Sequence, residues 1–262
     1  MTVPTIVATA HPSNQEGRLL LLGPSLGSDC AILWELVIPQ LRDRFRLVSW
    51  DLPGHAKSPM TAEAFSLAEL AQAVAGIAAE LGASAERPAL HAGVSIGGGT
   101  GLELARRFPD RFARVALVCS NHRFGGDAWP QTWIDRAALV RARSTSALVT
   151  TSAQKWFTPE SVEAHADTVG RLLHALQNAD DATYALCCEA LAAFDGEPFL
   201  PEITIPVLDV WGDRDETIAR ESAELLVATV PDARLVVVEG AAHLGTVDQP
   251  EAVAKALLEF FA

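Results

Sequence analysis

The feature that most constrains this chain is the pentapeptide Gly-Val-Ser-Ile-Gly at residues 93–97, which two further glycines follow directly. The short apolar run before it, residues 88–92, predicts a buried strand. Residues 99–108, which Pro109 follows, predict a helix. A serine between glycines at a strand-to-helix turn is strained, and the turn lifts its hydroxyl out of the sheet toward the first N–H groups of the helix. The pattern therefore favours a nucleophilic Ser95 over a plain glycine-rich turn.

Strand and helix patterns alternate along most of the chain. The predicted strands are residues 5–10, 19–22, 45–50, 88–92, 113–119, 206–211 and 235–239. The predicted helices between and after them are residues 31–41, 67–81, 99–108, 219–230 and 250–261. Such alternation is typical of a mostly parallel sheet covered by helices on both faces, so we expect an α/β fold.

The alternation is interrupted between residues 123 and 200, where helical patterns prevail. These helices are predicted at residues 132–140, 145–155, 161–177 and 181–193. Three of the six tryptophans lie in this stretch: Trp129, Trp133 and Trp156. We expect residues 1–122 and 201–262 to form one core, and residues 123–200 to form a helical lid over the carboxyl ends of its strands.

A serine hydroxyl becomes a good nucleophile only when a base takes its proton and an acid orients that base. Asp215 follows the predicted strand 206–211, and His243 follows the predicted strand 235–239. Both therefore leave the carboxyl end of a strand, where the active sites of such sheets lie. The order serine, acid, histidine predicts Ser95 as nucleophile, Asp215 as acid and His243 as base.

Other titratable residues are alternatives for these roles. Asp213 lies nearer to the end of its strand than Asp215 and is the alternative acid. His122, just past a strand end, is the second choice for the base. Among the other histidines, His91 is predicted in the core, His55 is predicted to line or support the pocket, and the rest are expected at the surface or in the lid: His11, His165 and His174.

Acyl transfer also requires hydrogen-bond donors for the oxyanion of the transition state. The N–H of Ile96, directly after the nucleophile, is the first candidate. The second should come from the loop after an early strand, and the N–H of Leu26 is in that place. A simple turn at residues 23–28 is the alternative.

Bulk properties exclude several other functions. With 262 residues, of which 49% are hydrophobic, the chain can build one large core. Its formal net charge of −13 argues against nucleic acid or an anionic membrane as a partner. We find neither metal-ligand spacing among the histidines nor a G-x-G-x-x-G motif after the first strand, so we expect no metal and no other cofactor.

The cysteines and the first residues indicate a cytoplasmic protein. Adjacent Cys187 and Cys188 lie in an apolar run, and together with Cys30 and Cys119 they are expected to be buried reduced thiols. The N-terminal residues show no basic region followed by an apolar core, so we expect no signal peptide. The apolar run 19–22 is too short to span a bilayer.

These motifs together resemble the α/β-hydrolase superfamily over essentially the whole chain. The serine turn, the Asp51-x-x-Gly-His55 loop, the Gly212-x-x-Asp215 loop and the Ala-Ala-His243 loop all stand at the family's places. The resemblance implies the α/β-hydrolase fold, with an inserted helical lid and a Ser-Asp-His triad.

Within the superfamily, the chain is most similar to 3-oxoadipate enol-lactonases of the β-ketoadipate pathway. The similarity rests on residues 23–29, 133–136, 155–159 and 184–191. It implies hydrolysis of 3-oxoadipate enol-lactone to 3-oxoadipate, in the catabolism of aromatic compounds, through an acyl-enzyme. Two departures border the expected pocket: Gly23-Pro24 replaces the usual Ser-Asn, and Ala56 replaces a glycine.

A small anionic lactone or ester would need a local cation, because a protein of net charge −13 does not attract it from a distance. A guanidinium can bind a carboxylate with two parallel hydrogen bonds. Arg136 is the candidate, and it shares a helix face with Trp133 three residues earlier. A solvated Arg136 is the alternative, and the carboxylate would then bind elsewhere, at Arg123 or Arg141.

Two other functions compete with the enol-lactonase hypothesis. One is another lactonase or carboxylesterase on the same scaffold, such as an acyl-homoserine lactonase. The other is a ligand receptor with little turnover, which the presence of all three triad residues disfavours. A haloalkane dehalogenase is disfavoured because it would need a carboxylate at the position of Ser95.

Overall fold

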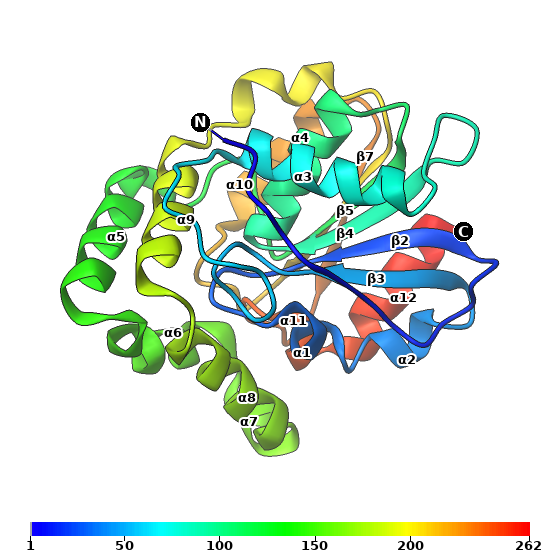
Figure 1. Ribbon diagram of the computed structural model, residues 1–262. Coiled ribbons are helices and arrows are strands. Elements are labelled where there is room, and N and C mark those ends of the chain that lie inside the picture. Colours follow the sequence, from blue (N-terminus) through cyan, green and yellow to red (C-terminus); the bar gives the residue numbers. More distant parts are fainter. Residues whose placement is uncertain (1) are drawn as a thin grey trace.

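The computed structural model describes residues 2–262 and contains a seven-stranded sheet (Figure 1). Along the sheet the strand order is β1-β3-β2-β4-β5-β6-β7, and β1 alone pairs antiparallel with its neighbour. The predicted mostly parallel sheet is thereby confirmed. The strands are β1 Ala8–Ala10, β2 Arg18–Gly23, β3 Phe45–Trp50, β4 Ala89–Val94, β5 Phe112–Val118, β6 Val207–Gly212 and β7 Ala233–Val238.

The strand order reverses at β2, which has β3 on one side and β4 on the other. Gly23, the last residue of β2, lies in register with Gly93 near the end of β4. The loops that follow these two strands therefore begin side by side at the carboxyl edge of the sheet. In open α/β sheets, ligands bind in the crevice at such a reversal point.

Helices cover both faces of the sheet, as predicted (Figure 1). In the figure, α3, α4 and α10 lie above the sheet, and α1, α2, α11 and α12 lie below it. These helices are α1 Cys30–Trp34, α2 Ile38–Leu41, α3 Leu67–Glu80, α4 Ile96–Arg107, α10 Arg220–Thr229, α11 Gly245–Asp248 and α12 Pro250–Phe261.

The remaining helices lie between β5 and β6 in the chain and gather at one side of the sheet (Figure 1). We call residues 123–200 the helical insertion. Its α-helices are α5 Gln131–Arg143, α6 Val149–Trp156, α7 Pro159–Ala164, α8 Ala166–Gln177 and α9 Asp181–Ala193, and α5 packs against α9. Short 3₁₀ helices occur at Gly126–Ala128, Thr145–Leu148 and Glu197–Glu202.

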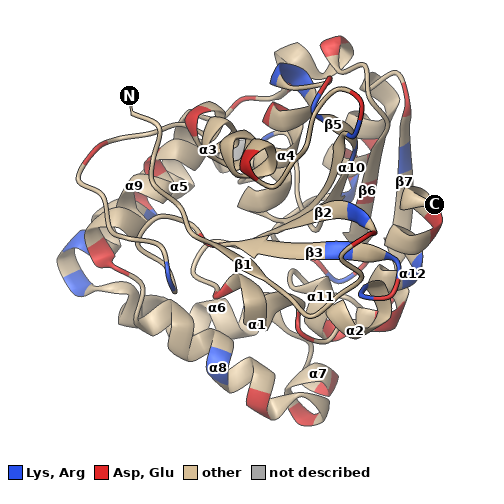
Figure 2. Ribbon diagram, turned by 45° about the vertical axis from the view of Figure 1, so that its right-hand side comes forward, with Lys and Arg blue, Asp and Glu red and all other residues tan. Residues whose placement is uncertain are grey.

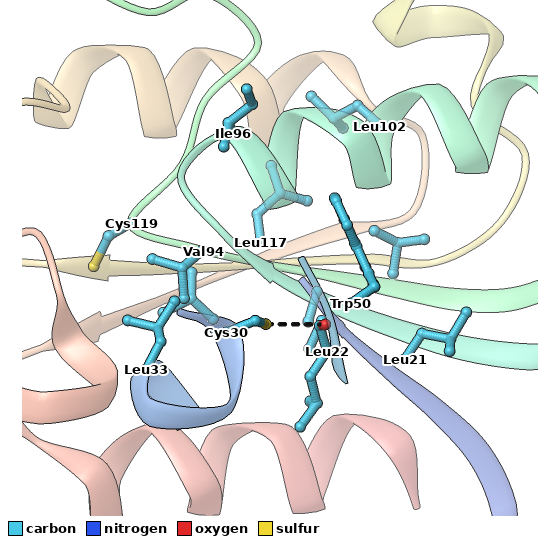
Figure 3. Close-up of a cluster of buried hydrophobic side chains, with 14 of the residues drawn as sticks. Leu21, Leu22, Cys30, Leu33, Trp50, Val94, Ile96, Leu102, Leu117 and Cys119 are labelled. Carbon is cyan, nitrogen blue, oxygen red and sulfur yellow. Dashed lines mark hydrogen bonds between the residues drawn. The ribbon is translucent and has the colours of Figure 1, made fainter. Parts of the chain in front are cut away.

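The core lies on both faces of the sheet, where the central strands are nearly continuous apolar runs. Every residue of β4 and β6 is buried, as is every residue of β2 except Arg18. Figure 3 shows part of this core, in which the thiol of Cys30 donates a hydrogen bond to the carbonyl of Leu22 (3.3 Å). The four cysteines are buried free thiols, and burial raises the pKa of Cys119 and Cys187 well above the ordinary value.

Several predicted element boundaries were wrong. The predicted helix 31–41 is two helices, α1 and α2, because Pro39 has no N–H to continue a helical ladder. The predicted helix 161–177 breaks at His165, whose φ of −127° and ψ of 37° lie outside the helical region. The segment 145–155 begins as a 3₁₀ turn, and the predicted strand 5–10 pairs only at residues 8–10.

Asp and Glu residues occur on most of the helices, interspersed with Lys and Arg residues (Figure 2). Among residues 2–262, no helix is long and apolar enough to cross a membrane.

Candidate active site

Ser95 lies in the turn between β4 and α4 with a φ of 52° and a ψ of −119°, a strained conformation for a residue with a side chain. The flanking glycines leave no room for a Cβ. One at Gly93 would lie 2.2 Å from the carbonyl carbon of Gly97, and one at Gly97 would lie 2.6 Å from the carbonyl oxygen of Pro24. Helix α4 accordingly begins at Ile96, three residues before its predicted start.

Residues at and just after the end of the neighbouring strand β5 form hydrogen bonds with this turn. The N–H of Ser95 donates to the carbonyl of Val118 (3.0 Å). The hydroxyl of Ser120 donates to the carbonyl of Ser95 (2.6 Å). A Cβ at Gly98 would lie 2.4 Å from that hydroxyl oxygen, so the close approach of the segment after β5 explains the glycine at this position.

Two backbone N–H groups beside Ser95 make no hydrogen bond to any described residue. They belong to Leu26, in the loop after β2, and Ile96, the first residue of α4. The N–H of Gly97 donates to the carbonyl of Pro24 (3.0 Å), which holds the two loops together. The structure therefore places both predicted oxyanion donors on adjoining loops at the reversal point of the sheet.

His243 and Asp215 form a buried pair. The Nδ1 of His243 donates to the Oδ2 of Asp215 at 2.9 Å. The other carboxylate oxygen of Asp215 accepts from the backbone N–H groups of Thr217 (2.7 Å) and Ile218 (3.2 Å). These bonds fix the carboxylate, and through it they orient the imidazole ring.

Asp213, the alternative acid, makes a different contact. Its side chain is exposed and accepts a hydrogen bond from the N–H of Gly240 (2.7 Å), outside the pair formed by His243 and Asp215. This geometry favours Asp215 as the partner of the imidazole.

Among the described residues, no histidine other than His243 lines the cavity that contains Ser95. His91 is fully buried in the core, as predicted, where burial lowers its pKa to about 3. His122 is buried but does not line the cavity described below. His55 does not line it either, but its ring stacks on Tyr184, and burial lowers the pKa of His55 to about 4.

A cavity of about 340 Å³ lies between the core loops and the helical insertion. Ser95 and His243 line it together with Leu26. The insertion and the loop after Asp215 supply most of the remaining lining: Gly125, Gly126, Thr132, Trp133, Arg136, Ser152, Lys155, Trp156, Glu216, Thr217 and Ala219, with Ser25 completing the set. Both predicted substrate-binding residues, Trp133 and Arg136, are among them.

Arg136 is half-buried and held by neutral groups. Its Nε and Nη2 donate to the hydroxyl of Tyr184 (3.0 and 2.8 Å), and Nη2 also approaches the hydroxyl of Ser152 (3.3 Å). Its guanidinium lies 5.8 Å from the ring centroid of Trp133. A guanidinium held by neutral hydroxyl acceptors and aromatic rings keeps its charge available to an anionic ligand.

The two other arginines of the helical insertion that the sequence suggested, Arg123 and Arg141, pair with carboxylates. Arg123 pairs with Asp195 (2.7 Å) and Glu197 (3.1 Å). Arg141 pairs with Glu189 at 2.5 Å. Neither arginine lines the cavity, so Arg136 is the better-placed candidate for binding a carboxylate.

Sequence reasoning assigned no role to four residues that complete this site. Trp156 and Lys155 line the cavity. The hydroxyls of Ser152 and of Tyr184, on α9, accept hydrogen bonds from Arg136. Tyr184 and Trp156 fall in stretches that resemble the enol-lactonases, and that signal could have singled them out. For Ser152 we find no comparable signal in the sequence.

The residues that depart from the enol-lactonase pattern, Gly23, Pro24 and Ala56, are not among those that line the cavity. Gly23 packs in the core, where a Cβ would lie 3.1 Å from the ring of Trp50 and 3.2 Å from the Nε2 of His91. Ala56 adopts a φ of 44°, a left-handed conformation in which glycine is the less strained residue. Neither departure therefore supplies a side chain to the cavity, although Pro24 directly precedes the lining residue Ser25.

Metal ligands are not gathered at this site or elsewhere in the described part of the chain. Among the side chains that the structure describes, no three histidine, cysteine, aspartate or glutamate residues are placed to share an ion.

Similarity to known proteins extends over nearly the whole chain. A model of the alpha/beta hydrolase fold family matches residues 19–250. The chain is 32% identical over 234 residues to 3-oxoadipate enol-lactonase 2 of Acinetobacter baylyi, which covers 89% of this chain and 84% of that relative. It is 29% identical over 250 residues to pimeloyl-[acyl-carrier protein] methyl ester esterase of Edwardsiella ictaluri, with 92% of each covered.

Among solved structures, the enol-lactonase from Burkholderia xenovorans superposes with a TM-score of 0.90 at 27% identity. That superposition covers 98% of this chain and 96% of the other, so it includes the sheet and the helical insertion alike.

Proposed function

This chain belongs to the alpha/beta hydrolase family, and on that premise we propose that it hydrolyses the ester bond of a small lactone or ester that carries a free carboxylate. The observation that carries the proposal is a single cavity lined by a strained serine, a buried histidine and an arginine: Ser95, His243 and Arg136. The serine and histidine suit acyl transfer, and the arginine suits the carboxylate.

In the first half of the proposed reaction, His243 takes the proton of the Ser95 hydroxyl through Nε2, the nitrogen opposite the one bonded to Asp215. The serine oxygen then attacks the ester carbonyl carbon. The negative charge that develops on the carbonyl oxygen is stabilised by the N–H groups of Leu26 and Ile96. Loss of one such donor typically costs about 3–4 kcal/mol in the transition state.

In the second half, the imidazolium of His243 returns its proton to the leaving oxygen, and an acyl-enzyme remains on Ser95. In a lactone this leaving oxygen stays attached to the acyl group, because opening the ring breaks only one bond. Water, deprotonated by the same histidine, then releases the acid and restores the serine. Asp215 keeps the imidazole oriented through both steps.

The proposed substrate class follows from the cavity and from the relatives. A volume of about 340 Å³ suits a small molecule. Arg136 supplies a cation whose neighbours among the described side chains are neutral. Since relatives named as enol-lactonases recur in both the sequence and structure comparisons, we take 3-oxoadipate enol-lactone, opened to 3-oxoadipate in the catabolism of aromatic compounds, as the first substrate to test.

The helical insertion is proposed to act as a lid on a core formed by residues 1–122 and 201–262. It supplies Trp133 and Arg136 to one side of the cavity, and the core supplies Ser95 and His243 to the other. A cytoplasmic location is part of the proposal, supported by four buried cysteines that form no disulfide with one another.

The test is to incubate the protein with freshly made 3-oxoadipate enol-lactone and to follow the loss of its ultraviolet absorbance, with Ser95→Ala as control. Fast loss with the wild-type protein alone supports the proposal. Other lactonase or carboxylesterase activity is examined in parallel, with an acyl-homoserine lactone and with p-nitrophenyl acetate. If wild type and Ser95→Ala behave alike on every substrate, the chain is a ligand receptor and the proposed function is wrong.

A further inference from the structure

The loop that carries His243 is hydrogen-bonded to the helical insertion through a buried carboxylate. Asp248, the last residue of α11, accepts from the N–H of Ala242 through Oδ2 (2.7 Å). Its Oδ1 accepts from the N–H of Thr158 (3.1 Å) and lies 3.4 Å from the hydroxyl of the same residue. One carboxylate thus joins the residue before His243 to Thr158, the N-cap of α7.

A second contact joins the two segments on the other side of the histidine. The N–H of Leu244 donates to the carbonyl of Trp156 at 2.9 Å. Both neighbours of His243 are therefore tied to residues 156–158 of the insertion. The side chain of Trp156 lines the cavity together with His243. The position of the imidazole in the cavity consequently depends on how this loop sits against the insertion.

From this arrangement, which rests on the proposed function, we propose that Asp248 is a positioning residue that sets His243 at its working distance from Ser95 by fixing its loop to the helical insertion. Asp248 does not face the cavity and touches no reacting atom. Its effect on the reaction passes through the backbone of Ala242 on one side and of Thr158 on the other.

The chemistry of this contact requires an ionised carboxylate. Two backbone N–H groups, from opposite segments, point at two different oxygens. An amide of the same shape has one accepting oxygen and one NH₂ group, so it can satisfy only one of these donors and faces the other with a second donor. Burial raises the pKa of Asp248, which shows that keeping this carboxylate ionised inside the protein is unfavourable in itself.

The experiment compares Asp248→Asn with the wild-type protein on p-nitrophenyl acetate, with active sites counted by the burst of p-nitrophenol. Because misplacing a catalytic group by about 1 Å can cost on the order of 10²-fold in rate, we expect kcat per active site to fall about 10- to 100-fold. We expect KM to change less than about threefold, since the cavity lining is unaltered. If Asp248 served only the stability of the fold, the substitution would unfold part of the protein. The unfolded molecules would lower the amplitude of the burst, and kcat per active site would stay unchanged.

Asp180→Asn is the matched control. Asp180 also accepts from the N–H and hydroxyl of a threonine in the insertion, Thr183, at 2.8 and 2.6 Å. It has no contact with the loop of His243 among the described hydrogen bonds, and asparagine caps a helix about as well as aspartate. We expect its kcat per site to stay within about twofold of wild type.

Thr158→Pro breaks the same contact from the insertion, and so keeps the inference testable if Asp248→Asn does not fold. The φ of Thr158 is −77° and Phe157 before it is extended, so proline fits the backbone. It removes the N–H and also the hydroxyl, which caps α7 by accepting from the N–H of Ser161 (3.3 Å). We expect a similar fall in kcat, and no further fall when both substitutions are combined. The inference would be overturned if the losses in kcat of the two single variants multiplied in the double variant. It would also be overturned if the kcat of each single variant stayed within about twofold of the wild-type value.

This outcome is distinguishable from a failure of the proposed function. If wild type and Ser95→Ala release p-nitrophenol at equal rates, the hydrolase assignment itself fails. If only the wild type is active and Asp248→Asn turns over normally per site, the assignment stands and the role of Asp248 is wrong.

Discussion

The hydroxyl of Tyr184 on α9 accepts two hydrogen bonds from the guanidinium of Arg136 on α5, through Nε at 3.0 Å and Nη2 at 2.8 Å. Two helices of the insertion therefore determine the direction of one cation in the cavity. Tyr184 is fully buried, and its ring also stacks on His55 from the core. The cation is thus anchored, through a single phenol, to both parts of the molecule.

Replacing Arg136 by methionine should raise KM for an anionic lactone strongly while sparing a neutral ester of similar size. Hydrogen bonds to charged groups contribute about 1.5–3 kcal/mol, which corresponds to roughly 10- to 150-fold in KM. Steady-state kinetics on both substrates check this. Equal losses on the two would mean that Arg136 only supports the insertion, and the carboxylate site would then have to be sought elsewhere.

Tyr184→Phe should give a weaker version of the same effect. The cation stays in the cavity but loses the phenol that accepts two of its hydrogen bonds, so substrate binding suffers only through the poorer orientation of the guanidinium. We expect KM for the anionic lactone to rise about 2- to 10-fold, with kcat on a neutral ester unchanged. A variant that affects both substrates alike would indicate that the phenol acts on packing alone.

Ser95, His243 and Asp215 should behave as one unit. We expect Ser95→Ala and His243→Ala each to lower kcat by about 10⁴-fold or more, and the double variant to be little worse than either. Asp215→Asn should cost less than either, and Asp213→Asn should be mild, because Asp213 contacts only the N–H of Gly240 among the described groups. A larger loss for Asp213→Asn than for Asp215→Asn would reverse the assignment of the acid.

Asp209→Asn should stabilise the protein increasingly as the pH rises. Both carboxyl oxygens of Asp209 are buried without a partner among the described residues, and burial raises its pKa well above the usual value. Above about pH 4 the unfolded chain releases this proton while the folded chain keeps it, so the free energy of unfolding of the wild type falls with pH by up to about 1.4 kcal/mol per pH unit. The asparagine variant lacks this contribution, while the contributions of all other groups are common to both proteins.

Calorimetric melting at pH 4, 6 and 8 measures this difference. The gain in Tm should be smallest at pH 4 and largest at pH 8. The exposed Asp110→Asn serves as the matched control, with no such trend expected. A gain that is constant with pH would show that Asp209 is already ionised in the folded protein.

Gly93→Ala should destabilise the fold severely, since its Cβ would lie 2.2 Å from the backbone of Gly97 in the turn that holds Ser95. Overpacking typically costs about 1–3 kcal/mol, and more where backbone must move. The control is Gly76→Ala in the middle of α3, where nothing lies within 4 Å of the added Cβ. There we expect the free energy of unfolding, measured by thermal or denaturant unfolding, to rise by about 0.5–1 kcal/mol, because alanine is the better helix former.

The sequence by itself determined the order of the elements and the turn that carries Ser95. Both are local properties: apolar runs with glycine and proline boundaries predict strands and helices, and Gly-x-Ser-x-Gly predicts a tight turn. For the same reason Asp215 and His243 could be placed after strands, and the mostly parallel sheet could be inferred. Helix breaks were missed where a local irregularity, such as Pro39 or His165, interrupts an otherwise helical pattern.

The tertiary structure alone decided which of several equivalent side chains meet. Asp213 and Asp215 are two residues apart, and only folding brings one of them to 2.9 Å from His243. Arg123 and Arg141 are as plausible as Arg136 until packing pairs the first two with carboxylates. The bond from Asp248 to Thr158 spans 90 positions of sequence. Such contacts depend on distances of a few ångströms between distant segments, which the packing of the whole core and insertion determines and local sequence patterns do not encode.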